Sequence, residues 1–129
     1  MHLFPHRYEV NLAGGAEGYA SLCTTGVPPL LTAPPLQFDG PGDAWSPEHL
    51  LLASVQGCFA FTLRAVARRM NVTVNALEIN AAGTVHRLAG VARFGEIVLR
   101  PIISVDASVS HEVVTELLDA TAKASLISA

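Results

Sequence analysis

The stretch from Ser46 to Met70 constrains the fold of this chain more than any other part of the sequence. Ser46-Pro47-Glu48 supplies a helix N-cap, a proline suited to the first helical position and an acidic side chain in the first turn, where the helix dipole favours it. A helix of about 24 residues, or roughly 36 Å at 1.5 Å per residue, can follow. Its side chains are apolar nearly all round until the arginines near its C-terminal end. We therefore expect a long helix that other elements enclose.

The residues before this helix predict an N-terminal β-hairpin and a long loop. Apolar and polar side chains alternate over residues 6–13, and residues 19–24 resume an extended pattern after a glycine-rich turn. Five prolines and several glycines over residues 26–43 prevent a continuous helix or an interior strand. We expect an ordered loop there, with an edge strand near Gln37 and Phe38.

The residues after this helix predict two strands and a second helix. Residues 72–85 and 91–103 are rich in β-branched side chains and alternate in part, which is typical of antiparallel strands joined by a turn near Ala89-Gly90. Ser110 begins the second helix. The predicted stripe of this helix at helical spacing consists of Val114, Leu118, Thr121 and Ser125. The order of elements predicts an α+β fold, in one domain that spans residues 1–129.

Composition limits the kinds of partner that the protein can bind and the cellular compartment in which we expect it. Charged residues make up 15% of the chain and the net charge is -3, so no basic field attracts nucleic acid or an anionic membrane. The N-terminal residues lack the basic and apolar regions of a signal peptide. The uncharged run from Leu50 to Leu63 is shorter than the roughly 20 residues that span a bilayer. We therefore expect a cytoplasmic protein that binds neither nucleic acid nor membranes.

The sequence contains two cysteines, Cys23 and Cys58, whose separation excludes the common zinc spacings. The histidines show no ligand spacing either, so we expect no metal and no cofactor. In a reducing cytosol a structural disulfide is not expected, and each thiol is either an inert core residue or a redox group. A cysteine within an apolar helix, as Cys58 is, is commonly a buried small hydrophobic residue.

The sequence around Cys58 resembles the signature of the OsmC/Ohr family of thiol peroxidases. The matching stretch is WSPEHLLLASVQGCF, residues 45–59, in which Cys58 follows ten positions after Glu48, as the peroxidatic cysteine does in that family. The resemblance extends to the glycine-rich turn of the hairpin, to Phe38-Asp39-Gly40 and to a closing-helix motif over residues 123–128. It implies an OsmC-like α+β fold and an intertwined homodimer with active sites at the interface.

The resemblance also implies a function, the cysteine-dependent reduction of organic hydroperoxides in oxidative stress defence. Cys58 is expected to attack the peroxide and become a sulfenic acid, a second cysteine to resolve it, and a dithiol reductant to restore the thiols. Glu48 is expected to orient the positive group that holds the thiolate, or to handle a proton. Unbroken helix separates Glu48 from Cys58 by about 15 Å, so they meet only if the helix breaks or if a partner subunit contributes one of them.

The sequence departs from the family pattern at the activating arginine and at the resolving cysteine. The positions of the family's arginine are occupied by Ala16 and Gln37, and a serine, Ser125, stands where the resolving cysteine is expected. Cys23 can replace that cysteine only if its Cα lies within about 7 Å of the Cα of Cys58. The side chains that could replace the arginine are His49, Arg7 and Arg64.

Two functions therefore stay open at this point. The first is a peroxidase in which Cys58 is the nucleophile and Glu48 assists it. The second is a non-catalytic member of the family that holds a small hydrophobic molecule in an apolar pocket beside Cys58 at the dimer interface. The missing arginine, the missing resolving cysteine and the apolar neighbours of the thiol favour the second.

Overall fold

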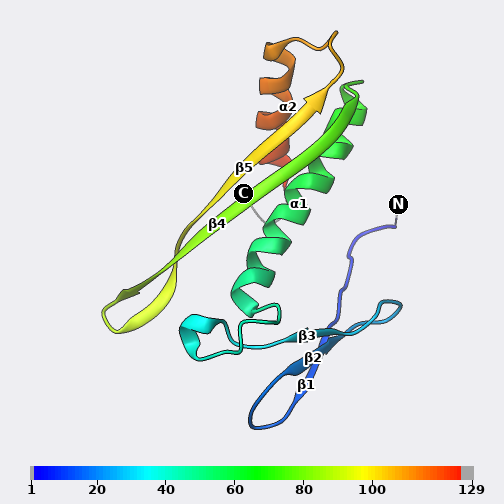
Figure 1. Cartoon of the computed structure of the whole chain (residues 1–129). Coiled ribbons are helices and arrows are strands. Elements are labelled where there is room, and N and C mark those ends of the chain that lie inside the picture. The colour runs from blue at the N-terminus through cyan, green and yellow to red at the C-terminus, as the bar shows by residue number, and fades with distance from the viewer. Residues whose placement is uncertain (1, 126–129) are drawn as a thin grey trace. The chain divides into compact units, whose positions relative to one another are not determined.

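The computed structural model describes residues 2–125 and confirms the predicted α+β class and order of elements (Figure 1). Within this range the elements are β1 (Asn11–Gly14), β2 (Ala20–Cys23), β3 (Leu30–Thr32), the short 3-10 helix η1 (Leu36–Phe38), α1 (Pro47–Arg69), β4 (Val74–Leu88), β5 (Val91–Val105) and α2 (His111–Ala124). The chain forms two compact units, of which the first ends at Leu50 and the second begins at Leu51. The single domain expected from the sequence stays a prediction.

The N-terminal unit is built on an antiparallel sheet in the order β1-β2-β3. The predicted hairpin is present, with Leu12 opposite Leu22, and β3 adds a third strand that pairs Thr32 with Ala20. Strand β3 was not predicted.

The edge strand predicted near Gln37 and Phe38 is wrong, because these residues belong to η1. The amides of Phe38 and Asp39 donate hydrogen bonds to the carbonyls of Pro35 and Leu36, at 2.9 and 3.0 Å. Asp39 then takes the left-handed conformation, with a φ of 63°, which ends the turn. This part of the proline-rich loop therefore satisfies its backbone groups by turning on itself, whereas Leu30–Thr32 in the same loop pairs with β2.

Helix α1 begins and ends close to the predicted residues. The Ser46 hydroxyl accepts a hydrogen bond from the amide of His49 at 3.1 Å, as expected of an N-cap, and Ser46 is fully buried. The helix ends at Arg69, one residue before the predicted end. Asn71 adopts a left-handed conformation there, with a φ of 56°, and the amide of Val72 bonds back to the carbonyl of Ala67.

The second unit consists of the β4-β5 hairpin and the helices that pack on it. A two-residue turn joins the strands at Ala89 and Gly90, which both have positive φ, as the tightest hairpins require. Both strands are longer than predicted. Figure 1 shows α1 and α2 on the same side of this hairpin. Their shared core consists of Phe59, Leu63, Val66, Ala67, Val72 and Leu117.

Helix α2 is capped by Ser110, as predicted, but the stripe that it buries differs from the predicted one. Ser110 accepts a hydrogen bond from the amide of Val113 at 3.2 Å. The most deeply buried positions are Leu117, Thr121 and Ser125, so the sequence analysis missed Leu117. Spacing alone places a stripe on a helix to within about one position, and packing against α1 decides which position is central.

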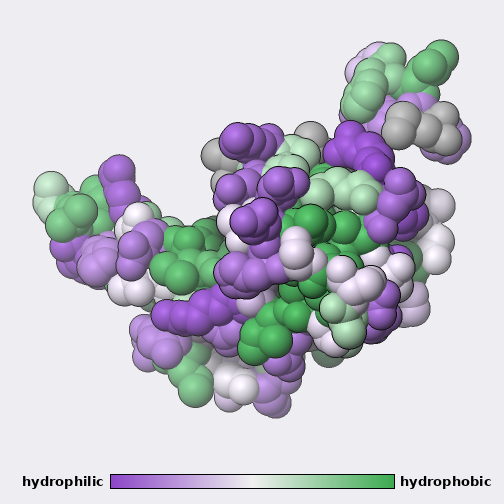
Figure 2. Space-filling view, turned by 90° about the horizontal axis from the view of Figure 1, so that it is seen from above, coloured by the Kyte–Doolittle hydropathy of each residue, from purple (hydrophilic) through white to green (hydrophobic). Residues whose placement is uncertain are grey.

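By length and composition alone, α1 could cross a membrane. The shorter uncharged run from Leu50 to Leu63 had not indicated this. The core helix of a soluble protein passes the same test. Within the second unit, one side of α1 packs into the core, while Phe61 on the same helix is 65% exposed. Figure 2 shows apolar side chains exposed among polar ones on the face that it presents. Only 28% of the most apolar stretch of α1 is buried in the chain that the structure describes.

Candidate functional site

The structure brings Cys58 and Ser125 together. Cys58 lies on α1 and is half-buried, and Ser125 caps the C-terminal end of α2 with 3% of its surface exposed. The sulfur of Cys58 and the hydroxyl oxygen of Ser125 are 3.1 Å apart, although the residues are 67 positions apart in the sequence. The packing of Leu117 into the core holds α2 against α1 in this register. The position expected for a resolving group therefore lies beside the thiol and carries a hydroxyl.

The sequence neighbours of Cys58 on α1 include a glutamine anchored to the sheet and a glycine. The side-chain amide of Gln56 donates a 2.8 Å hydrogen bond to the carbonyl of Ile79 on β4, which ties this turn of the helix to the sheet. Among the described residues, a Cβ atom added at Gly57 would meet the ring of Phe61, at 4.0 Å. The turn that carries the thiol is therefore fixed to the sheet through Gln56.

The side chains that could replace the family's arginine all have other interactions. His49 Nδ1 lies 2.6 Å from the hydroxyl of Ser46 at the start of α1. Arg7 forms an ion pair with Glu9, and both side chains are largely exposed. The guanidinium of Arg64 lies 5.3 Å from the centre of the Phe61 ring. The residues at the family's arginine positions, Ala16 and Gln37, are exposed in the β1-β2 turn and in η1.

Glu48 lies in the first turn of α1, within the N-terminal unit, and its Oε1 atom is buried without a hydrogen-bond partner among the described residues. Because α1 is continuous from Pro47 to Arg69, about 15 Å of helix rise separates Glu48 from Cys58. The first condition for a shared site, a break in the helix, is therefore not met. The second, a contribution from a partner subunit, stays a prediction.

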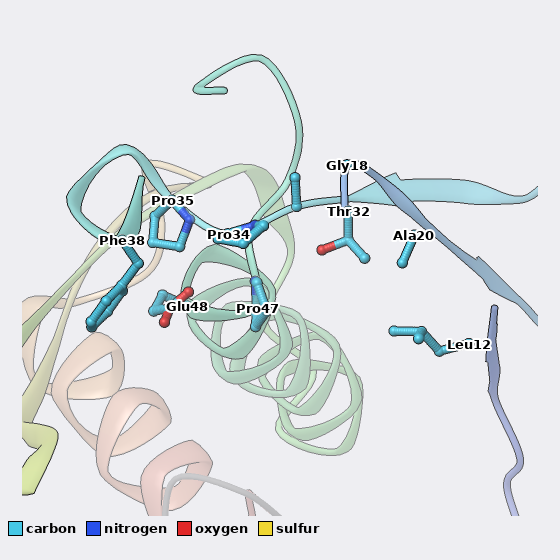
Figure 3. A pocket seen from close by; sticks show the side chains of 10 residues that line it. Leu12, Gly18, Ala20, Thr32, Pro34, Pro35, Phe38, Pro47 and Glu48 are labelled. Atoms are coloured by element: carbon cyan, nitrogen blue, oxygen red, sulfur yellow. The ribbon is translucent and has the colours of Figure 1, made fainter. Parts of the chain in front are cut away.

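Glu48 lines a cavity of about 320 Å³ in the N-terminal unit. Figure 3 shows the side chains of Glu48, Phe38 and Pro35 on one side of this pocket and those of Thr32 and Leu12 on the other. Thr32 is 4% exposed, and its hydroxyl oxygen also has no hydrogen-bond partner among the described residues. The pocket thus has apolar walls and two unsatisfied polar atoms. Sequence analysis missed Thr32, because no pattern distinguishes it from a loop threonine.

The Phe38-Asp39-Gly40 motif shapes one wall of this pocket. A side chain at Gly40 would overlap the carbonyl of Pro34, and the amide of Gly40 donates a 2.9 Å hydrogen bond to the carbonyl of Pro35. Only glycine permits this close approach. The motif is therefore explained by the path of the backbone, which turns Phe38 towards Glu48 (Figure 3).

The other cysteine lies in the N-terminal unit. Cys23 is exposed at the end of β2, with its sulfur 3.7 Å from the Ser21 hydroxyl. Its proximity to Cys58 stays a prediction. Among residues 2–125, no cluster of three or more histidine, cysteine or acidic side chains is placed to hold a metal ion. Of the closing-helix motif, residues 126–128 lie outside the described residues.

Comparisons with known proteins identify the family. The family model described as OsmC-like protein matches residues 40–129. An uncharacterised protein of Bacillus subtilis (strain 168), YmaD, is 32% identical over 76 residues, which are 57% of this chain and 51% of that protein. The chain thus spans about half the length of this curated relative.

Solved structures of low identity share the fold. An OsmC-like protein of unknown function from Vibrio cholerae has a TM-score of 0.87 at 13% identity, with 96% of this chain and 92% of that chain covered. An organic hydroperoxide resistance protein OsmC from Legionella pneumophila has a TM-score of 0.76 at 20% identity, with 96% and 89% covered. These structures support the fold, and the family model covers more than half of the sequence. The chain therefore belongs to the OsmC-like protein family.

Proposed function

We propose that this protein reduces organic hydroperoxides in the cytoplasm, as part of oxidative stress defence, and that Cys58 is the peroxidatic thiol. The observation that carries the proposal is the 3.1 Å approach of the Ser125 hydroxyl to a half-buried Cys58 sulfur. Family membership supports it, because a solved structure with the same fold is named an organic hydroperoxide resistance protein.

In the proposed reaction the Cys58 thiolate attacks one peroxide oxygen. The O–O bond breaks, an alcohol leaves after taking up a proton, and the sulfur is oxidised to a sulfenic acid. When the Ser125 hydroxyl acts as the donor in its contact with Cys58, it stabilises the negative charge of the thiolate. Ser125 thereby replaces part of the stabilisation that an arginine supplies elsewhere in the family.

The sulfenic acid is then resolved by a dithiol from outside the chain. Ser125 occupies the position next to the sulfur and, being a serine, cannot form a disulfide with it. One thiol of the external reductant condenses with the sulfenic acid, which forms a mixed disulfide and releases water. The second thiol attacks that disulfide, which releases the Cys58 thiolate and leaves the reductant oxidised.

The proposal includes a homodimer in which Glu48 of one subunit acts on Cys58 of the other. Within one chain the unbroken helix keeps these residues apart. Exposed apolar side chains, such as Phe61 on α1 and Val10 before β1, provide surface that association would cover. In such a site Glu48 orients the donor groups around the peroxide or carries a proton to the leaving alcohol.

Loss of cumene hydroperoxide in the presence of dithiothreitol tests the peroxidase reaction. We expect C58S to fall to the rate of buffer alone and C23S to keep the wild-type rate, because only Cys58 is the nucleophile. Equal rates for C58S and the wild type would end the enzymatic proposal. A C23S variant as inactive as C58S would show that the resolving thiol is internal.

Mixing two inactive variants tests the shared site. If Glu48 and Cys58 act across the interface, heterodimers of E48Q and C58S contain one intact site each, and random exchange restores about a quarter of the sites. If both residues act within one chain, the mixture is no more active than its components. Light scattering gives the oligomeric state, for which we expect twice the 13.6 kDa of one chain.

A second candidate function, the non-catalytic binding of a small molecule, is favoured by the pocket that Glu48 and Thr32 line. Its apolar walls suit a hydrophobic body. The pocket lies in the N-terminal unit, and the pocket expected beside Cys58 at the dimer interface stays a prediction. Peroxide turnover and ligand binding are separate measurements, so each candidate can fail without the other.

A further inference from the structure

A hydroxyl group lies beside the Cys58 sulfur. The Ser125 oxygen is 3.1 Å from this sulfur, and Ser125 is 3% exposed. The amide of Ser125 donates a 3.0 Å hydrogen bond to the carbonyl of Thr121, which is fully buried one turn earlier on α2. The packing of α2 therefore holds the hydroxyl beside the thiol.

A hydroxyl in this position can form a hydrogen bond to the oxidised sulfur. The sulfur–oxygen bond of a sulfenic acid is much shorter than 3.1 Å, so its oxygen comes within hydrogen-bonding distance of Ser125 when it tilts towards this residue. A serine hydroxyl both donates and accepts. It therefore pairs with the sulfenic acid, whose O–H donates, and with its anion, which accepts a stronger, charge-assisted bond.

A sulfenic acid is commonly lost by two routes, and Ser125 opposes both. The first is condensation with a nearby thiol, which gives a disulfide. A serine beside the sulfur cannot take part in this reaction. The second is further oxidation, in which the sulfur attacks another peroxide and becomes a sulfinic acid. A hydrogen bond to the sulfenic oxygen withdraws electron density from the sulfur and makes that attack slower.

We infer that Cys58 is oxidised to a sulfenic acid that persists, held by the Ser125 hydroxyl, until a thiol from outside the chain reacts with it. The inference rests on the peroxidase proposed above, because the peroxide supplies the oxygen and leaves as an alcohol. An external thiol then displaces this oxygen as water and forms a mixed disulfide, from which a second thiol releases Cys58. The protein is thus a redox switch with two long-lived states, and the supply of external thiol decides between them.

Trapping with dimedone, which reacts with sulfenic acids, tests the inference. Reduced protein is treated with one equivalent of cumene hydroperoxide at pH 7 without any thiol, and the remaining peroxide is removed. Dimedone is added after increasing delays, and mass spectrometry measures the labelled fraction of Cys58. We expect the wild type to be labelled at delays at which S125A no longer is. A hydrogen bond worth about 1 kcal/mol corresponds to a lifetime that is about fivefold longer.

Ser54 provides a matched control for Ser125. It lies on α1 one turn before Cys58, and its hydroxyl donates a 2.7 Å hydrogen bond to the carbonyl of Leu51. S54A should therefore keep the wild-type lifetime. S125C should give no label, because its new thiol condenses with the sulfenic acid, and C23S should behave as the wild type does. Melting curves show whether each variant is folded.

The inference fails if the sulfenic acid of the wild type is lost as fast as that of S125A, or if one equivalent of peroxide already gives a sulfinic acid. A disulfide between Cys58 and Cys23 in the wild type would also overturn it. So would a label on S125C that lasts as long as on the wild type, a comparison that does not require S125A to fold. In each of these cases Cys58 still reacts with peroxide, so the proposed peroxidase stands. If Cys58 takes up no oxygen at all, both proposals fail.

Discussion

Replacing Ser125 with cysteine should create a disulfide with Cys58. The Cys58 sulfur and the Ser125 oxygen are 3.1 Å apart, and a disulfide needs a sulfur-to-sulfur distance of about 2.05 Å. An approach of about 1 Å is within reach of Ser125, because this C-cap residue of α2 has an extended backbone conformation and not a helical one. We therefore expect S125C to oxidise without distorting the core.

The length of the closed loop sets the size of the effect. The two positions are 67 residues apart, and for such a loop the loss of chain entropy in the unfolded state corresponds to about 4.4 kcal/mol. Engineered disulfides commonly deliver less than this limit, so we expect about 2–4 kcal/mol. For a domain of this size that raises Tm by roughly 5–15 °C.

The assay compares one variant in its oxidised and reduced forms. In a C23S background the S125C protein has two thiols, and peroxide treatment should remove both from titration with a thiol reagent. Urea unfolding of the two forms then gives the difference in the free energy of unfolding. Thiols that stay titratable would refute the reasoning, as would a bond found only between chains on a non-reducing gel. Equal stability of the two forms would refute the estimated magnitude.

Two further predictions concern the N-terminal unit. G40A should destabilise the protein by at least about 1–3 kcal/mol in urea unfolding, because its methyl group would overlap the carbonyl of Pro34. G15A is the control and should change stability by less than about 0.5 kcal/mol, because its added methyl meets no described residue within 4 Å. Similar losses for both variants would contradict this account. The hydrogen bond from the Tyr19 hydroxyl to Asp43, at 2.6 Å, raises the pKa of Tyr19 above its usual 10.0. Because the bond favours the protonated phenol, its stabilisation is full below pH 10 and is lost as the pH rises through the raised pKa. The other tyrosine is first replaced by phenylalanine, so that ultraviolet absorbance reports the phenolate of Tyr19 alone. In this background, D43N should therefore start to form phenolate at a lower pH than its parent. Coincident titration curves would contradict the assigned cause.

Local signals predicted most of the secondary structure. The cap at Ser46, the proline after it and the run of apolar side chains placed α1 to within one residue. The Ala89-Gly90 turn was predicted because its short loop separates two β-branched segments, and it has the positive φ values of a tight hairpin. Such features depend on residues a few positions apart, so the sequence carries them directly.

The loop before α1 shows where local signals failed. Prolines indicated an irregular segment, but they did not distinguish the predicted edge strand at Gln37 from the observed η1. The strand in fact forms at Leu30–Thr32, where β2 offers a partner. Strand formation depends on a partner that is distant in sequence, and a single segment contains no information about that partner.

Taken by itself, the sequence determined the order of elements, the caps of both helices and the positions of the two residues expected to carry the chemistry. Tertiary structure decided what surrounds them. It placed Ser125 at 3.1 Å from the Cys58 sulfur, and it put Glu48, whose Oε1 has no hydrogen-bond partner among the described residues, in a pocket that the buried Thr32 also lines. Periodicity and capping are properties of neighbouring residues, whereas these contacts arise only when the core packs segments that are far apart along the chain.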